Sequence, residues 1–198
     1  MTESGRPQPT QQGHSLADAV ECLKAGGLVA YPTEGVFGLG CDALDGAAVD
    51  RLLALKGREA AKGLIVIGAS LLQLEPLIQP LTREQRRKLE KHWPGPLTWI
   101  VPAADDAPEW LTGGRDTIAV RVPAHPIACN LCQLFRGPIV STSANRSGED
   151  AARDADTVAG LFPTGIDYIF DCPVAGLKGP SEIRELLTDR VIRPGGGQ

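Results

Sequence analysis

Long apolar runs and secretory features are missing from this 198-residue chain. No stretch approaches 18 consecutive apolar residues, and the N-terminal MTESGRPQPTQQGHS is polar throughout. We therefore expect neither a membrane span nor a signal peptide. Only five cysteines occur, an odd number at irregular spacing, which is typical of a reduced compartment rather than a disulfide scaffold. These absences predict a cytoplasmic protein with no membrane partner.

Common catalytic signatures are also missing. The chain has no G-x-x-x-x-G-K-[ST], G-x-S-x-G or H-E-x-x-H, and its three histidines form no metal-ligand pattern. The glycines of GVFGLG (35–40) are not in the dinucleotide-binding order, and a tight turn is the simpler interpretation. Cys129 and Cys132 lie in an apolar helix without a second pair, which favours core packing over zinc. We expect no metal-binding residues.

A basic excess is lacking too. The net charge of −4 argues against a protein that coats nucleic acid through overall basicity, although a local cationic pocket stays possible. The 42% hydrophobic content is ordinary for a globular protein, and the length suits one domain. We expect a disordered tail over residues 1–13 and one folded domain over 14–198.

Hydrophobic periodicity and capping residues predict both helices and strands. Strands sometimes alternate with helices and sometimes follow one another directly, which predicts an α/β or α+β domain with a mixed, twisted sheet. Helices are expected after Ser15, after Asp45 as far as Gly57, over 82–93, from Pro126 to Gly137, and over 157–162. Strands are expected at 28–31, 64–67, 97–101, 117–122, 138–142, 168–170 and 190–194.

Polar residues follow two of these elements. Thr33 and Glu34 leave a strand through a proline turn, and turn chemistry alone can account for them. Lys56, Arg58 and Lys62 cluster between a helix end and a buried strand. A helix C-terminus attracts cations through its dipole, but three converging cations also indicate an anion pocket.

The stretch PIVSTSANRSG (138–148) is an apolar strand that ends in hydroxyl groups. Ser141 and Ser143 lie on one side of that strand, whereas Thr142 faces the other side. Hydroxyls at a strand end commonly bind ligands, although the later residues fit a turn that caps the next helix. Arg121 interrupts an apolar strand, and Arg193 lies in the strand predicted at 190–194. A buried arginine needs an anion, supplied by the protein or by a ligand.

Together these segments resemble the YrdC-like family, and closely its single-domain bacterial members, the threonylcarbamoyl-AMP synthases. The resemblance covers nearly the whole chain after about residue 14. Its segments are AYPTEGVFGLGCD (30–42), LKGR (55–58), KGLIVI (62–67), WPGPLTWIVPA (93–103), WLTGG (110–114), TIAVRVPAHP (117–126), PIVSTSANRSG (138–148), PSEIREL (180–186) and RPG (193–195).

The resemblance implies a single YrdC-like domain, with flanking helices on a strongly twisted mixed sheet and a concave cationic pocket. It also implies synthesis of threonylcarbamoyl-AMP and pyrophosphate from L-threonine, bicarbonate or CO2, and ATP, with Mg2+ on the triphosphate. Other proteins of the tRNA threonylcarbamoyl-transfer machinery then move the threonylcarbamoyl group to adenosine 37 of tRNA.

The same resemblance implies roles for individual residues. Lys56 and Arg58 are the expected catalytic residues. Threonine would be held by Thr33, Arg121, Ser141 and Ser181, with Arg121 meeting the threonine carboxylate. ATP would be held by Lys56, Arg58, Lys62, Thr117, Ser143, Asn145 and Arg193.

The chain departs from the family at several positions. Glu59, Ala60 and Ala61 stand where the family often has a proline, and longer members carry Asn and His where Lys62 and Ile67 stand here. Longer members also close the pocket with a second domain. In this chain we expect the 110–115 loop to close it.

Two other functions fit the same residues. A module that binds double-stranded RNA or tRNA would grip a phosphate backbone in a cationic concavity, with steeply salt-dependent affinity. The net charge of −4 argues against this, while a weak tRNA contact is compatible with the synthase. A hydrolase or carbamoyltransferase module acting on a carbamoyl phosphate-like substrate is the third hypothesis, but fused or partner domains usually mark that use.

Overall fold

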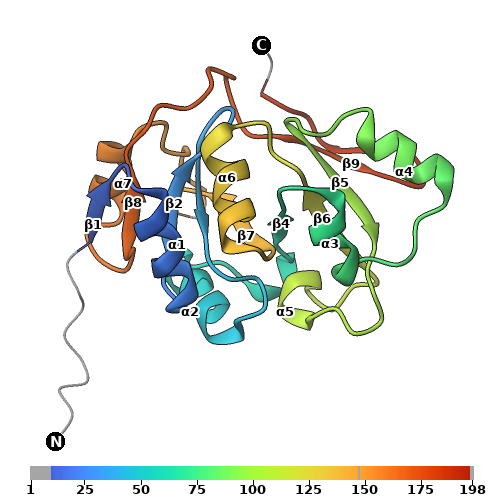
Figure 1. Cartoon of the computed structure of the whole chain (residues 1–198), viewed down its shortest axis with the longest axis horizontal. Helices are drawn as coiled ribbons and strands as arrows, with labels where there is room; N and C mark the ends of the chain where they lie inside the picture. The colour runs from blue at the N-terminus through green and yellow to red at the C-terminus, as the bar shows by residue number, and fades with distance from the viewer. Residues whose placement is uncertain (1–9, 147, 197–198) are drawn as a thin grey trace, which may run out of the picture.

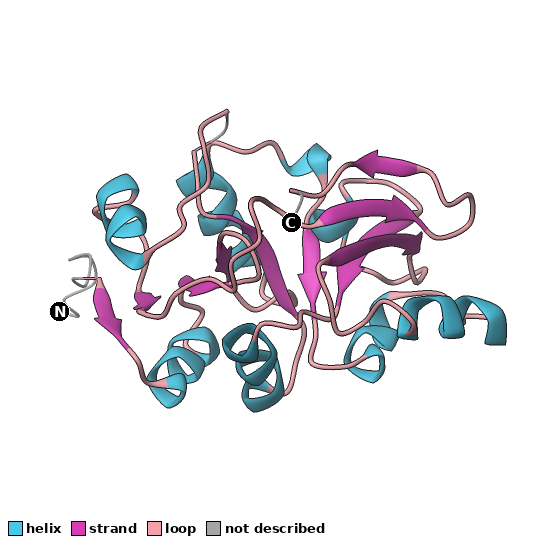
Figure 2. Ribbon diagram, turned by 90° about the horizontal axis from the view of Figure 1, so that it is seen from above, coloured by secondary structure: helices cyan, strands magenta, loops and turns pink. Residues whose placement is uncertain are grey.

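The structure, a computed structural model, describes residues 10–146 and 148–196. They form one ten-stranded mixed sheet with helices flanking it (Figures 1 and 2). The strand order is β1-β8-β2-β3-β7-β4-β6-β5-β9-β10. The bounds are β1 Gln11–Gly13, β2 Val29–Pro32, β3 Phe37–Gly40, β4 Ile65–Ile67, β5 Leu97–Pro102, β6 Thr117–Arg121, β7 Ile139–Ser143, β8 Tyr168–Phe170, β9 Glu182–Glu185 and β10 Val191–Arg193. The predicted fold class is confirmed.

Seven α-helices and two short 3-10 helices are present in the described residues. They are α1 Leu16–Lys24, α2 Gly46–Lys56, η1 Ala60–Lys62, α3 Leu71–Leu74, η2 Glu75–Leu77, α4 Arg83–Glu90, α5 Glu109–Thr112, α6 Pro126–Phe135 and α7 Ala155–Leu161. No helix in this part of the chain is long and apolar enough to cross a bilayer.

Side-chain caps explain where the longer helices begin and end. Ser15 accepts a hydrogen bond from the Asp18 amide, and Asp45 accepts two at the start of α2. Gly57 ends α2 in the left-handed conformation, as the sequence predicts. The end of α6 differs from the prediction, because Arg136 rather than Gly137 takes the left-handed position, with φ 63°.

The GVFGLG segment is not the simple turn that its glycines suggest. Only residues 33–36 turn, and Phe37–Gly40 is strand β3, antiparallel to β2 and β7. A Cβ on Gly40 would lie 2.4 Å from the Val140 carbonyl oxygen. The glycine therefore allows close strand packing, which sequence reasoning took for turn chemistry.

The predicted boundary of the N-terminal tail is also wrong. Residues 11–13 form β1, which pairs in parallel with β8, so the folded part begins before residue 14. Residues 1–9 of the predicted tail lie outside the described residues. Strand β9 was not predicted either, because three of the four residues of its sequence EIRE are charged and only one is apolar.

Two buried clusters stabilise the sheet from different sides. One cluster packs α1 and α6 against β2 and β8, and it includes Leu23, Tyr31 and Leu131. Cys132 is fully buried in this cluster, which confirms a core role for that cysteine. The larger cluster lies around Trp99 of β5 and extends to α2 and α7.

Glycine backbones bring the turn between β2 and β3 close to the segments that flank β9 and β10. Gly35, in the turn between β2 and β3, lies against Gly179, which precedes β9, and Gly179 in turn lies against Gly196. The Leu177 amide also donates to the Glu34 carbonyl oxygen, and the Gly196 amide to that of Pro180. Strands far apart in sheet order are thus joined at one backbone crossing.

Substitution of Gly35 by alanine tests this crossing, because the added Cβ would lie 2.0 Å from the Gly179 carbonyl oxygen. We expect Gly35→Ala to lower the free energy of unfolding by about 1–3 kcal/mol in urea titrations. Gly160→Ala is the matched control, since nothing lies within 4 Å of its Cβ. Because Gly160 lies within α7, that variant should gain about 0.5–1 kcal/mol from helix propensity. Equal stability of Gly35→Ala and wild type would contradict the close backbone contact between Gly35 and Gly179.

Candidate active site

A cavity of about 520 Å³ lies along β3, β7, β4, β6, β5, β9 and β10. Its walls combine cations, hydroxyl groups and aliphatic side chains. The cationic members are Arg58, Lys62, Arg115, Arg190 and Arg193, the hydroxyl members are Thr33, Thr112, Thr117, Ser141, Thr142, Ser143 and Ser181, and Glu185 is the carboxylate. A cavity of this size, with few anions and many donors, suits a polyanionic ligand.

Three of the hydroxyl residues predicted to hold threonine lie in this cavity: Thr33, Ser141 and Ser181. Each is at least nine-tenths buried and comes from a different element. The Thr33 hydroxyl donates to the Val36 carbonyl oxygen at 2.6 Å, and the Ser181 and Thr98 hydroxyl oxygens are 3.0 Å apart. The Thr33 hydroxyl oxygen keeps lone pairs that can accept from a ligand, whereas the Ser181 oxygen also accepts from Arg193 Nη2 at 3.4 Å.

Arg121 is the exception among the predicted threonine residues. Its Nη2 donates to the Glu34 carboxylate at 2.7 Å, and the other Glu34 oxygen accepts from the Ala124 amide at 2.8 Å. Both side chains are buried. The resemblance gives Arg121 a ligand carboxylate as its partner, but Glu34, which the sequence presents as a turn residue, already neutralises it in the structure. The contact of Arg121 with threonine stays a prediction. Arg121 Nε has no partner among the described residues and stays free to donate.

Arg58 and Arg193 lie in the cavity wall, as predicted. One Nη2 of each binds a backbone carbonyl oxygen, that of Gly63 at 2.9 Å for Arg58 and that of Ser181 at 2.7 Å for Arg193. Each Nε is buried without a partner in the described part of the chain. Burial lowers the pKa of both groups, and for Arg193 the positive charges of Arg121 and Arg58 lower it further. Arg121 and Arg58 therefore lie close enough for their charges to act on Arg193.

Lys56 and Asn145 were predicted to hold ATP, but neither lines the cavity. The buried Lys56 ammonium donates to the Ser143 carbonyl oxygen and to both oxygens of Asn145. The Ser143 hydroxyl donates to the Asn145 side-chain oxygen at 2.6 Å. Lys56 thus holds the end of β7 in place. Burial, and then the nearby charge of Arg58, lower its pKa to about 8.

Lys62, Thr117 and Ser143 line the cavity as predicted. Sequence reasoning missed Arg115 and Arg190, because each has an aspartate beside it and resembles an ordinary surface charge. Thr142 also contributes to the wall, although strand alternation predicted that it faces away.

The predicted 110–115 loop lies beside the cavity through Leu111, Thr112 and Arg115. Trp110 points elsewhere, since its indole nitrogen donates to the Ala43 carbonyl oxygen at 3.1 Å. Whether this loop closes the cavity stays a prediction.

The donor groups of the cavity do not form a resident metal site. No group of three histidine, cysteine, aspartate or glutamate side chains that could hold a metal ion is found over residues 10–146 and 148–196. Glu185 is the one carboxylate of the cavity wall, and Arg190 lies 3.8 Å from it. A divalent cation here would have to arrive with an anionic ligand that coordinates it.

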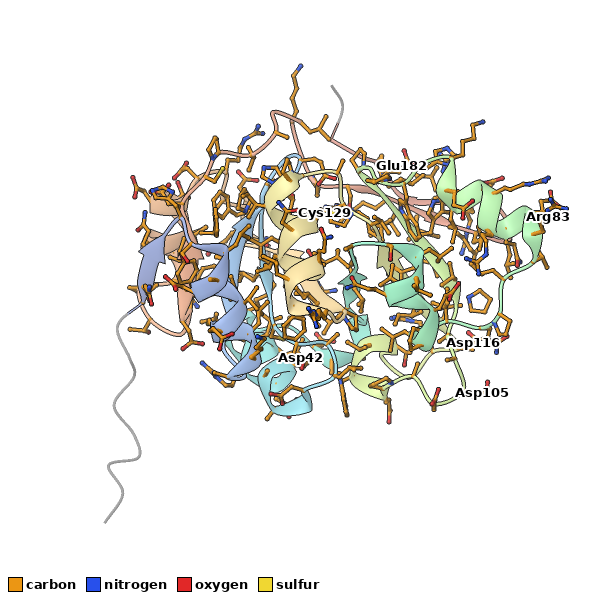
Figure 3. The ribbon with its side chains drawn as sticks, in the orientation of Figure 1. Asp42, Arg83, Asp105, Asp116, Cys129 and Glu182 are labelled. Atoms are coloured by element: carbon orange, nitrogen blue, oxygen red, sulfur yellow. The ribbon has the colours of Figure 1, made fainter. Side chains whose placement is uncertain are left out.

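Inorganic pyrophosphate should bind this cavity, because its oxygens can accept from the unpartnered guanidinium nitrogens. At a concentration about 100 times its Kd, it should raise the free energy of unfolding by about 2.7 kcal/mol. Arg58→Ala and Arg193→Ala should lose most of this gain in thermal unfolding. Arg83→Ala is the control, because Arg83 lies on α4 at the outer end of the molecule (Figure 3). Equal stabilisation of all three variants would place the anion elsewhere.

The chain matches a family model and many known proteins. The Sua5/YciO/YrdC model, described as "Telomere recombination", matches residues 21–195. The threonylcarbamoyl-AMP synthase of Coxiella burnetii is 45% identical over 179 residues, which are 90% of this chain and 96% of that protein. The enzyme of the same name from Halorhodospira halophila is 48% identical over 186 residues, 94% and 95% of the two chains.

Solved structures have the same fold. Sua5 of P. abyssi, complexed with L-threonine, superposes with a TM-score of 0.88 at 38% identity over 96% of this chain. The match spans 58% of that Sua5 chain. YciO of E. coli superposes with a TM-score of 0.82 over 98% of both chains, and at 24% identity it supports the fold alone. By its family match and by these relatives, the chain belongs to the Sua5/YciO/YrdC family.

Proposed function

We propose that this chain synthesises threonylcarbamoyl-AMP and pyrophosphate from L-threonine, bicarbonate or CO2, and ATP. The observation that carries the proposal is a cavity lined by hydroxyl groups whose wall includes Arg58 and Arg193, each with a buried Nε that has no partner among the described residues, with the charge of Arg121 close enough to lower the pKa of Arg193. The enzyme activity is that of the relatives that match nearly their whole length to this chain. The threonine complex of the P. abyssi protein supports threonine as the amino-acid substrate.

The arrangement of donors supports a division of the cavity between the two larger substrates. Thr33, Ser141 and Ser181 would hold threonine, and the free Nε of Arg121 would donate to its carboxylate. Because Glu34 already neutralises Arg121, this contact adds orientation more than charge compensation. Arg58, Lys62, Thr117, Ser143 and Arg193 would hold the nucleotide phosphates, while Lys56 and Asn145 support them by fixing the end of β7.

The chemistry then depends on positioning and electrostatic stabilisation. The threonine amine attacks CO2 with release of a proton, or bicarbonate with loss of water, and forms an N-carboxylate. An oxygen of this carbamate attacks the α-phosphorus, the bond to the β-phosphate oxygen breaks, and pyrophosphate leaves. Negative charge grows on the phosphate oxygens during the second step, and the fixed Arg58 and Arg193 can stabilise it. No protein nucleophile is required.

Magnesium belongs to this proposal as part of the nucleotide substrate. The cavity wall supplies one carboxylate, Glu185, which is too few for a dedicated magnesium site. We therefore expect Mg2+ to be bound by the triphosphate oxygens and to neutralise part of their charge.

Three further expectations belong to the same proposal. The product passes to the tRNA threonylcarbamoyl-transfer machinery, weak direct contact with tRNA is compatible with this transfer, and the protein is cytoplasmic. The alternative RNA-binding module has less support: although Lys62, Arg115 and Arg190 are exposed, they share the cavity wall with buried hydroxyl groups, which a grip on a phosphate backbone does not need.

Pyrophosphate release should require all three substrates. Omission of threonine, bicarbonate or ATP in turn should abolish the signal in a coupled pyrophosphate assay, and release without threonine would contradict the proposal. Arg58→Ala should lower kcat/KM about 100-fold or more, because one charge-stabilising donor is lost. Arg83→Ala, on the outer helix α4, should leave the rate unchanged. Near-normal turnover by folded Arg58→Ala would exclude the assigned cavity.

Nucleotide binding should also take up protons at pH 8. Burial and the charge of Arg58 hold the Lys56 pKa near 8, so the Lys56 amine is about half protonated at pH 8. Phosphates bound to Arg58 offset its repulsion, raise the Lys56 pKa and draw in up to roughly half a proton per nucleotide. Calorimetry with an ATP analogue in buffers of different ionisation enthalpy measures this uptake. Lys56→Arg should abolish it, whereas equal uptake by that variant would assign it to another group.

A further inference from the structure

The loop of residues 59–62 carries functional cations but has few contacts of its own. Arg58 precedes it and Lys62 ends it, and both line the cavity. Residues 59–62 are all exposed, so no apolar side chain anchors the loop in the core. Its own backbone bonds are the two of helix η1, from Lys62 to Glu59 and from Gly63 to Ala60. A segment with so few buried contacts opens easily unless something outside it holds it.

Arg115 provides contacts that hold this loop from outside it. Its Nη2 donates to the Ala61 carbonyl oxygen at 2.7 Å, and its Nη1 contacts the carbonyl oxygens of Lys62 and Thr112, both at 3.3 Å. One guanidinium thus ties the loop to the end of α5. Arg115 is itself exposed, and its two loop contacts lie near solvent, so they hold the loop without contributing to the core.

The backbone around this contact is shaped for close approach. A Cβ on Gly113 would lie 2.7 Å from the Ala61 carbonyl oxygen, and one on Gly63 would lie 3.0 Å from Arg115 Nη1. The Leu64 amide also donates to the Leu111 carbonyl oxygen at 2.9 Å, just beyond the loop. Glycines at both sides therefore let α5 and the loop come near enough for one side chain to bridge them.

We propose that Arg115 is a positioning residue that fixes the 59–62 loop, so that Arg58 and Lys62 face the nucleotide phosphates. The identity of that ligand rests on the proposed function. A guanidinium suits this task, because its planar fork can donate to several carbonyl oxygens at once. An ammonium keeps the charge but cannot span the same acceptors in one geometry. Substitutions can therefore separate the effect of the Arg115 charge from the effect of its hydrogen bonds to the loop.

The test compares Arg115→Lys and Arg115→Gln with Arg190→Lys and Arg190→Gln. Arg190 also lines the cavity, but no contact joins it to this loop in the described residues, so it is a matched control. Hydrogen exchange of the 59–63 amides should become faster in both Arg115 variants and stay unchanged in both Arg190 variants. The KM for ATP should rise about tenfold in both Arg115 variants, the loss expected for one charge-assisted bond. The KM for threonine should stay within about twofold of the wild-type value, since Arg115 contacts none of the residues assigned to threonine.

Two results would overturn the proposal that Arg115 fixes the loop through its hydrogen bonds. Normal exchange and normal ATP KM in Arg115→Lys, with a defect only in Arg115→Gln, would show that Arg115 acts through its charge alone. Unchanged loop exchange in both variants would show that other contacts hold the loop. The exchange measurement needs no substrate, so it stays decisive even if wild type binds no nucleotide, a result that would instead remove the proposed function. An unchanged urea midpoint confirms that the variants are folded.

Discussion

Three guanidinium groups with buried Nε atoms, two of which lower the pKa of the third, set the constraint on which the cavity depends. Arg58, Arg121 and Arg193 lie close enough for the first two to lower the pKa of the third. Glu34 neutralises Arg121 directly, whereas backbone carbonyl oxygens hold Arg58 and Arg193 without neutralising them. Of these three cations, a protein carboxylate compensates one, and none compensates the other two among the described residues. A ligand with several negative charges supplies the missing compensation, and this is why the cavity suits a triphosphate next to a carboxylate.

The sheet makes this concentration of charge possible. Arg58 follows α2, Arg121 ends β6, and Arg193 ends β10 at the edge of the sheet. The contact of Gly35 with Gly179 joins the β2-β3 turn to the segment before β9, although several strands separate them in sheet order. Strand β7 lies in the middle and pairs with β3 through its last residues and with β4 through its first ones. Ser141 and Ser143 of β7 therefore line the cavity between β3 and β4.

Local sequence signals predicted much of the fold, and the family resemblance pointed to eight residues that line the cavity: Thr33, Arg58, Lys62, Thr117, Ser141, Ser143, Ser181 and Arg193. The caps at Ser15, Asp45 and Gly57 depend on neighbouring residues, and they are where the sequence places them. The errors have long-range causes. Gly40 serves packing against β7, residues 11–13 pair with β8, and Glu34 meets a residue 87 positions away. Arg115 escaped notice for the same reason, since its partners are backbone oxygens that only the fold brings near.

The central claim is that one cavity joins threonine, a one-carbon unit and the adenylate of ATP. Mass spectrometry of the reaction mixture tests it most directly, with isotopically labelled threonine and bicarbonate supplied in separate and combined experiments. The account predicts one product whose mass carries both labels together with AMP. Consumption of ATP without that doubly labelled adenylate, or its formation with only one of the labels, would contradict it.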